Sequence, residues 1–513
     1  MNDSPLVRIG LDEGGFFLGK KIPIFYNALL LTGVNLLLRF IGTSFQVFLS
    51  GKIGAEGIGL LQLVLSIGSM AMTAGMGGIR TATMYLCAEA VGQKRKERLP
   101  WIISGCVLYS LLISSLVGIL LFTSAPWIAN EWIGDRSVIG AVRLLAVFLP
   151  VNCLCGVMVG HFTGINRIGT LAVVEVAEQL LSMGFTIILL SLWAKNDTAR
   201  SCLSVIVGSG SGAAFTLVTL VLLKQKEKST IGTRTSVRGK LFETAVPLAI
   251  ADDVKAGIST TENLMVPKRL GLYANEMTPL ATFGIVCGMV FPVIMFPTAI
   301  LFGLAELLIP ELARCNAAGS RKRIKHLAER SLMMTLIYGA ICGGILIISA
   351  ENLCMKLYES KEAGNYLQWY AILAPMLYCD MIVDAMAKGL GQQKICVRYN
   401  IITSALDVAL LYVLLPRYGM NGYFVSFLIT HLLNFFLSAR LLFKITGNII
   451  PLNIVLKCIL SASASILTGM SFNVVWLKIC VFLATFLSLS ILLGVIKHID
   501  YLWLKKLILH AKR

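Results

Sequence analysis

The stretch LFETAVPLAIADDVKAGISTTENLMVPKR, residues 241–269, decides how the rest of the chain is interpreted. It is long and apolar enough to cross a bilayer, yet it contains Asp252, Asp253, Lys255 and Glu262. A charge near the centre of a spanning helix costs about 2.5–3.5 kcal/mol, so such groups usually face a protein interior or a water-filled cavity. Two interpretations stay open. Either Asp252 and Lys255 neutralise each other one turn apart and join helices, or these charges line a polar pathway.

The composition is that of an integral membrane protein. Of the 513 residues, 57% are hydrophobic and 14% are charged, whereas a soluble domain carries about 25% charged residues. The net charge of +18 is explained by Lys and Arg in cytoplasmic loops, and we expect no nucleic-acid partner. The thirteen cysteines form no CxxC pair and lie mostly in apolar segments. We therefore expect reduced thiols that pack as small hydrophobes.

Runs of about 17–25 mostly apolar residues predict membrane-spanning helices. Fourteen such runs occur, with approximate limits 24–48, 58–87, 101–123, 138–162, 170–194, 201–223, 241–266, 281–309, 331–350, 369–389, 396–415, 421–443, 452–472 and 474–496. With both termini inside, the cytoplasmic segments hold 30 Lys and Arg and the external loops hold nine. This asymmetry predicts a multi-pass protein of the plasma membrane with both termini in the cytoplasm.

The chain divides into two similar halves around a basic linker. Pro150 precedes Gly164, and Pro375 precedes Gly389, by the same fourteen residues in the fourth and tenth spans. Transporters often duplicate a helix bundle, so we expect two six-helix lobes followed by two more helices. The predicted divisions are a cytoplasmic segment 1–23, a first lobe 24–223, a basic cytoplasmic linker 224–240, a second lobe 241–443, a helix pair 444–496 and a basic amphipathic cytoplasmic tail 497–513.

Three cations deep inside predicted spans form a first set of candidate site residues. Arg39, Arg80 and Lys255 lie in the first, second and seventh spans. The other three cations inside spans lie where they can reach a membrane interface. A guanidinium makes bidentate bonds to phosphate oxygens, so cations that line a cavity between the lobes suit a diphosphate or another anion. A packing role for each of the three stays open.

Carboxylates inside the spans form a second set. The set consists of Asp252, Asp253, Glu175, Glu178, Asp380, Asp384 and Asp407. In transporters such groups carry protons or coordinate Na⁺. Asp384 also has a favourable pairing with Lys388 one turn later, which would make it structural. Ion coupling and structural compensation therefore both stay open.

Motifs for covalent chemistry are missing from the sequence. It contains neither a GxxxxGK[ST] phosphate loop nor an HExxH pair, and its five histidines lack the spacing of metal ligands. The loops are too short to build the catalytic surface of a membrane glycosyltransferase or polymerase. We therefore expect a protein that is not an enzyme and that has neither a cofactor nor a metal site. Transport would be driven by a gradient, by the membrane potential or by a partner.

Five stretches carry a resemblance to a known family. They are LLLRFIGTSFQVFLSGKIGAEGIGLLQL (36–63), MGGIRTATMYLCAEA (76–90), VGHFTGINRIGTLAVVEVAEQLL (159–181), ENLMVPKRL (262–270) and GMVFPVIMFPTAILFGLAELLIPELA (288–313). By their order and spacing the whole chain resembles a polysaccharide-biosynthesis flippase of the multidrug/oligosaccharidyl-lipid/polysaccharide exporter superfamily. The stage V sporulation protein B group is the nearer relative in this pattern, and the lipid II flippases are more distant.

The resemblance implies a V-shaped, alternating-access transporter whose first, second, seventh and eighth spans line a central cavity. It implies that Arg39 and Arg80 lie in this cavity. The implied substrate is a lipid-linked oligosaccharide or polysaccharide precursor for the cell envelope or spore cortex. Membrane lipids, H⁺ or Na⁺, and cell-wall synthesis proteins are the other implied partners. Where relatives place a second arginine six or seven residues after the first, this chain has Phe45 and Gln46, which argues against lipid II itself.

Two other functions stay open. A cation-coupled multidrug antiporter of the same superfamily should offer acidic residues in the first lobe and tolerate a less basic cavity. Arg39 and Arg80 favour the lipid-linked saccharide instead. A non-transporting membrane assembly scaffold is the second alternative, because its role would need no particular residue for covalent chemistry.

The predicted topology has a direct test in a cysteine-free variant. A single cysteine in the 224–240 linker should resist an impermeant thiol reagent in intact cells, because this segment is predicted to be cytoplasmic. A cysteine in place of Asn196 should react, because that loop is predicted to be external. Labelling is measured by mass shift on gels, and the reverse pattern would overturn the topology.

Overall fold

The computed structural model describes residues 22–93, 95–194, 197–225, 238–274, 278–447 and 452–495. All regular secondary structure in these ranges is helical, which confirms the predicted all-α membrane fold. Residues 1–21 of the predicted N-terminal segment, most of the linker 224–240 and the predicted tail lie outside the described residues.

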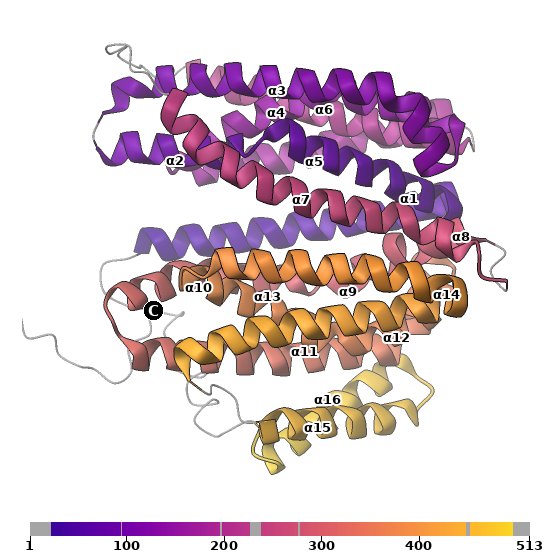
Figure 1. Cartoon of the computed structure of the whole chain (residues 1–513). Helices are drawn as coiled ribbons and strands as arrows, with labels where there is room; N and C mark the ends of the chain where they lie inside the picture. Colours follow the sequence, from indigo (N-terminus) through magenta and orange to yellow (C-terminus); the bar gives the residue numbers. More distant parts are fainter. Residues whose placement is uncertain are drawn as a thin grey trace, which may run out of the picture.

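The first half of the chain forms one bundle around α4. Its helices are α1 (Ile22–Met76), α2 (Ile79–Gly92), α3 (Leu99–Trp127), α4 (Ile139–Gly164), α5 (Ile168–Leu189) and α6 (Thr198–Gln225). α4 contacts α2, α3 and α6, and α5 packs on α6. These helices form the upper bundle of Figure 1, whereas the first part of α1 runs between the bundles.

The second half forms another bundle, although the first part of its first helix packs on the first half, where Ala245 joins that bundle's hydrophobic cluster. Its helices are α7 (Arg238–Leu270), α8 (Pro279–Phe283), the π-helical segment η5 (Gly284–Val290), α9 (Phe291–Met295), α10 (Thr298–Ala317), α11 (Arg321–Tyr358), α12 (Lys361–Tyr370), α13 (Ala374–Gly389) and α14 (Gln393–Thr446). α13 contacts α10, α11 and α14. The pair α15 (Leu452–Met470) and α16 (Val475–Leu492) packs on α11 outside this bundle (Figure 1).

Two long helices are each divided by a glycine with positive φ. Gly54 in α1 has φ 71°, and Gly419 in α14 has φ 58°. Residues with a Cβ rarely adopt this conformation, so glycine lets the chain bend sharply without leaving a helical path on either side. As a result, α1 supplies both the first predicted span and most of the second, and α14 supplies the eleventh and twelfth.

Ten helices of the described part are long and apolar enough to cross a membrane, or up to eleven when the pair Pro279–Met295 and Thr298–Ala317, bent by 58°, counts as one span. The divided helices α1 and α14 each count once in this total. The charge-rich α7 is not among the ten. The protein is thus a multi-span membrane protein, and the number of fourteen crossings stays a prediction.

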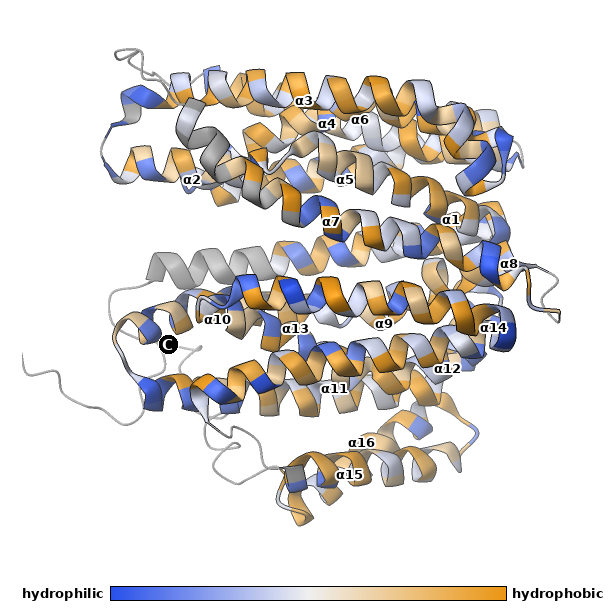
Figure 2. Ribbon diagram, viewed as in Figure 1, coloured by the Kyte–Doolittle hydropathy of each residue, from blue (hydrophilic) through white to orange (hydrophobic). Residues whose placement is uncertain are grey.

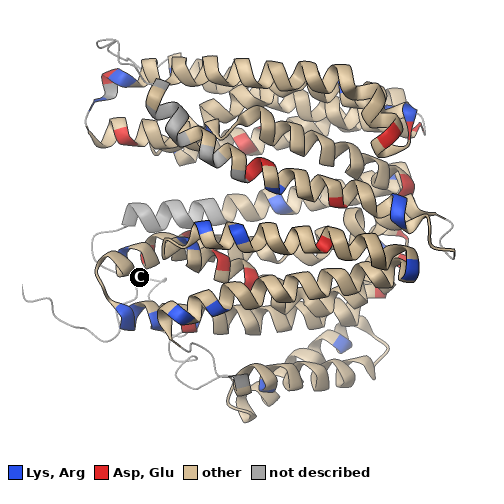
Figure 3. Ribbon diagram, viewed as in Figure 1, with Lys and Arg blue, Asp and Glu red and all other residues tan. Residues whose placement is uncertain are grey.

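The outer surface is apolar, as lipid contact requires. Leu112 of α3 is 64% exposed, Phe436 of α14 is 72% exposed and Leu492 of α16 is 79% exposed. Figure 2 shows apolar residues along most of α3, α15 and α16, whereas α14 also carries hydrophilic residues on the side that faces the viewer. Acidic residues, in contrast, also occur inside α7 and α14 (Figure 3). Because lipid cannot solvate these charges, their partners must come from neighbouring helices or from water.

Candidate functional site

A cavity of about 730 Å³ separates α1 from the interrupted helix that runs through η5, α9 and α10. Its polar lining includes Asn35, Arg39, Gln46 and Gln62 of α1, and Phe291 is among its apolar residues. Among the described residues that line it, Arg39 is the only charged one. A mostly apolar cavity of this size with a few polar groups is typical of a small-molecule site.

Arg39 is held by the second bundle. One guanidinium nitrogen, Nη2, donates to the carbonyl of Met295 at 2.9 Å and to Oγ1 of Thr298 at 3.4 Å. The carbonyl of Met295 accepts this bond because the helix is interrupted there. The amide of Ala299, which would serve it in a regular helix, donates to Phe296 instead. Arg39 lies in the lining of this cavity, and its role in binding a substrate stays a prediction.

Arg80 and Lys255 lie outside the lining of this cavity. Arg80 is exposed in the first turn of α2 and is close enough to Glu175 of α5 to interact electrostatically. Lys255 is exposed on α7. The structure therefore does not gather the three predicted cations in one pocket in this conformation.

The carboxylates beside Lys255 do not neutralise it in this conformation. Among the described residues, no ion pair within 4.0 Å joins Lys255 to Asp252 or Asp253. Asp252 is exposed, whereas Oδ1 of Asp253 is buried without a hydrogen-bond partner. Of the two interpretations of α7, the structure gives no support to direct pairing of Asp252 with Lys255.

A pair of carboxyl groups joins α7 to α14. Glu262 and Asp407 lie within hydrogen-bonding range of each other. Asp407 is only 4% exposed and also accepts bonds from Ser426 Oγ at 2.5 Å and Thr430 Oγ1 at 3.0 Å. Two adjacent carboxyl groups in a low-dielectric interior repel each other when both are charged, so such a pair is a natural place for a shared proton or a bound cation. Glu262 was not among the candidate residues, although its place in the charged stretch 241–269 was a signal.

The remaining predicted carboxylates have local or structural partners. Asp380 of α13 accepts bonds from Asn434 Nδ2 at 3.1 and 3.3 Å. Asp384 forms a 2.8 Å ion pair with Lys388 one turn later, which is the compensating pair that its sequence position suggested. In the first bundle, Glu178 of α5 accepts a 2.7 Å bond from Thr216 of α6.

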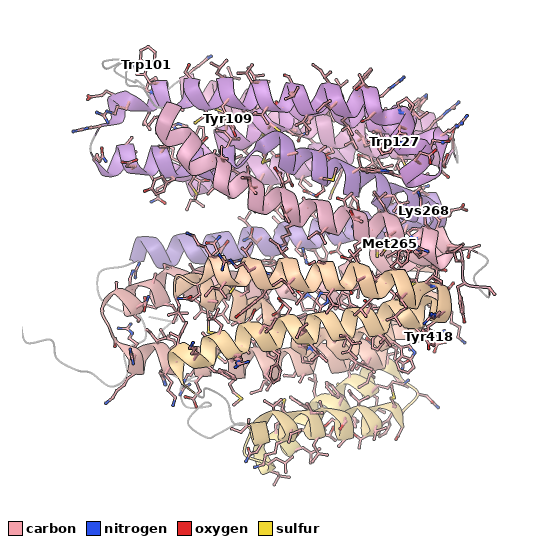
Figure 4. All side chains as sticks on the ribbon, in the orientation of Figure 1. Trp101, Tyr109, Trp127, Met265, Lys268 and Tyr418 are labelled. Atoms are coloured by element: carbon pink, nitrogen blue, oxygen red, sulfur yellow. The ribbon has the colours of Figure 1, made fainter. Side chains whose placement is uncertain are left out.

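The two bundles touch tightly at the end of the molecule near α8. A Cβ placed on Gly284 would lie 2.1 Å from the carbonyl oxygen of Ala55, so only glycine allows α1 to approach η5 this closely. Lys268 of α7 donates to the carbonyl of Glu131 in the first half of the chain. Its neighbour Arg269 stays within the second half, where its guanidinium lies 3.3 Å from the ring centroid of Tyr412 in α14. Figure 4 shows Lys268 at the same end as Trp127 and Tyr418.

Long helices with an apolar outer surface, an interrupted helix between the bundles and carboxylates in the interior define an all-α integral membrane protein. The chain belongs to the MatE family, whose model matches residues 31–188 and 273–413. It is therefore a membrane transporter of the MOP superfamily.

Known relatives agree with this assignment. Stage V sporulation protein B of Bacillus subtilis is 20% identical over 410 residues, which cover 77% of this chain and 79% of the relative. A solved structure of the lipid II flippase MurJ in an inward closed conformation matches with a TM-score of 0.67 at 14% identity, over 90% of this chain and 98% of that chain. An inward-facing multidrug MATE transporter matches with a TM-score of 0.65 at 12% identity, over 82% and 99%. These structural likenesses concern the fold.

The close approach at Gly284 generates a prediction about stability. Gly284→Val should push α1 away from η5, because its side chain would overlap the Ala55 carbonyl. Overpacking of this kind costs about 1–3 kcal/mol, so we expect a lower midpoint of thermal unfolding in detergent. Gly184→Val is the control, because a Cβ on Gly184 meets no atom within 4 Å. Equal midpoints for both variants would contradict the prediction.

Proposed function

We propose that the protein flips a lipid-linked oligosaccharide or polysaccharide precursor across the plasma membrane by alternating access, for assembly of the cell envelope or spore cortex. The observation that carries this proposal is Arg39 in the lining of the 730 Å³ cavity. A guanidinium binds phosphate oxygens in a bidentate manner, and the amide side chains of Asn35, Gln46 and Gln62 in the same lining can bond sugar hydroxyls.

The proposed motion involves two lobes, 24–223 and 241–443, with 444–496 packed outside the second lobe and both termini in the cytoplasm. Arg80 and Lys255 are exposed on α2 and α7, so we propose that they meet the phosphate groups when the lobes rearrange. Glu175 beside Arg80 would receive that cation when no substrate is bound. Asp252 and Asp253, which form no ion pair with Lys255 in this conformation, would pair with it at another stage of the cycle. The acyl chain of the substrate would remain among membrane lipids.

We further propose that a cation gradient drives transport. The paired carboxyls of Glu262 and Asp407 are the best candidates for a proton or Na⁺, and Asp380 lies on the neighbouring helix α13. Asp384 has Lys388 as a partner and is therefore assigned a structural role, as is Glu178 with Thr216. Cell-wall synthesis proteins are the proposed partners that would deliver or use the saccharide.

Buried carboxylates also suit a second candidate function, cation-coupled multidrug antiport. Asp407 with Glu262 is the observation that favours it. The two functions differ in the charge of the substrate, because a cavity whose charged group is Arg39 should repel a cationic drug. Uptake of a fluorescent cationic dye by energised proteoliposomes, without flipping of a lipid diphosphate sugar, would select the antiporter.

Replacement of Arg39 should reduce the rate of flipping, and the reduction should be larger when the positive charge is removed than when it is kept. Because hydrogen bonds to charged groups contribute about 1.5–3 kcal/mol, Arg39→Ala should lower the rate by about 10- to 100-fold. Arg39→Lys should retain part of the rate, since it keeps the charge but loses the bidentate contact. The measurement is flipping of a fluorescent lipid diphosphate sugar in proteoliposomes.

Each variant of this series needs a check that it elutes as a single species in detergent. Arg80→Ala and Lys255→Ala are measured in the same assay, because both are proposed to meet phosphate during the cycle. Well-folded alanine variants at all three positions that flip substrate at the parent rate would reject the cationic-cavity mechanism.

The coupling proposal predicts different effects for two aspartates. Asp407→Asn should change the pH or Na⁺ dependence of transport, because it removes one ionisable partner of Glu262. Asp384→Asn should leave this dependence unchanged, since Asp384 is paired locally with Lys388. Initial rates are measured across a pH series with and without Na⁺. If the Asp407 variant and the parent protein show the same dependence of the initial rate on pH and Na⁺, Asp407 has a structural role and not a coupling role.

A further inference from the structure

Two side chains of α1 bond to main-chain carbonyls of the second bundle with matching spacing. Arg39 donates to the carbonyl of Met295 at 2.9 Å, and Gln46 Nε2 donates to the carbonyl of Gly288 at 3.0 Å. The donors are seven residues apart on α1, and the acceptors are seven residues apart in the opposite chain direction. The two bonds therefore lie about two helical turns apart along one seam.

The acceptors on this seam exist because prolines interrupt the helix. Gly288 lies in the π-helical segment η5, and Pro292, four residues later, has no amide hydrogen that could donate to its carbonyl as in a regular α-helix. Pro297 likewise interrupts the helix beside Met295, where α9 ends and α10 begins. A buried carbonyl must find another donor when its helical partner is missing. α1 supplies a donor at both places, in addition to the local donor Thr298 at Met295.

Other carbonyls at this interruption have donors from within the second bundle, and these bonds do not depend on where α1 lies. The carbonyl of Ile294 accepts from Tyr378 at 2.6 Å, and that of Pro297 accepts from Tyr338 at 2.8 Å, both within the second bundle. The Met295 carbonyl has a local donor too, Thr298 Oγ1, at 2.6 Å. If Arg39 leaves, this carbonyl keeps one hydrogen bond, so the release of Arg39 leaves no unpaired group behind.

We infer that Arg39 and Gln46 form a two-point latch that holds α1 against the η5–α10 helix, and that an anionic substrate opens it by taking the Arg39 guanidinium. A phosphate forms shorter, charge-assisted and bidentate bonds to a guanidinium, whereas the Met295 carbonyl is neutral and offers one. Exchange from carbonyl to phosphate is therefore favourable. Gln46 has no charge, so it closes the seam without competing for the phosphate.

The phosphate part of this inference rests on the proposed function, whereas the latch in the substrate-free protein does not. An uncharged substrate would leave Arg39 on Met295 and the seam closed. Substrate charge would thus decide whether the bundles separate. Arg39 would both bind the substrate and couple this binding to the separation of the bundles.

The test measures the distance between α1 and α10 in lipid nanodiscs. Spin labels replace Phe40 and Ile300, which are 58% and 50% exposed, in a cysteine-free background, and pulsed electron resonance gives the distance distribution. Without any ligand, Arg39→Met should raise the ratio of separated to closed molecules by about tenfold, as expected for the loss of a hydrogen bond to a charged group. Gln46→Leu should produce a smaller increase.

Two further variants keep the test interpretable. Arg143→Met is the matched control, because Arg143 lies over the ring of Phe122 within the first bundle and its loss should leave the distances unchanged. Thr298→Val should keep the seam closed without ligand, because the Met295 carbonyl then has Arg39 as its remaining side-chain donor. Ligand-free distances in Arg39→Met and Gln46→Leu that match those of the parent would overturn the latch.

Farnesyl diphosphate, with farnesol as the uncharged control, tests the phosphate step. The diphosphate should raise the separated fraction of the parent protein towards that of Arg39→Met, and farnesol should have no effect. A parent distribution unchanged by the diphosphate would overturn phosphate release even if the ligand-free latch stands. The proposed function has a separate test, because it fails only if the parent protein does not flip the lipid diphosphate sugar in proteoliposomes.

Discussion

The interruption of the helix between Phe291 and Thr298 is the constraint on which the seam depends. In a bilayer no water satisfies a freed carbonyl, so every break in a spanning helix requires donors from its neighbours. Here Tyr378, Tyr338 and Thr298 supply donors from inside the second bundle, and Arg39 of α1 adds one more at the carbonyl of Met295. A backbone irregularity thus fixes where a cation from the other half of the chain comes to lie.

The same rule explains the interior carboxylates. Asp407 lies before the bend at Gly419 in α14, and its hydrogen-bond donors Ser426 and Thr430 lie after it. The bend folds one helix back beside itself, so that polar groups of both arms meet in the protein interior rather than in lipid. Glu262 of α7 joins this cluster from a third direction, which places two acidic groups together in a well-packed bundle.

Much of the fold follows from local sequence. Apolar runs predict the helices, because 17–25 apolar residues match the thickness of a bilayer. The pairing of Asp384 with Lys388 is also local, since residues four apart face each other on one helix turn. The cost of a buried charge grouped Arg39, Arg80 and Lys255 as candidate cavity residues. Arg39 lines the cavity between α1 and the interrupted helix, whereas Arg80 and Lys255 lie outside its lining.

The sequence by itself determined that this is a helical membrane protein with charges in its interior, because composition and periodicity act over a few turns of helix. Only the tertiary structure decided which groups meet. Arg39 and the Met295 carbonyl are 256 residues apart in the chain, and Glu262 and Asp407 come from different helices. No local pattern encodes such contacts, because they depend on how bundles, bends and breaks pack together.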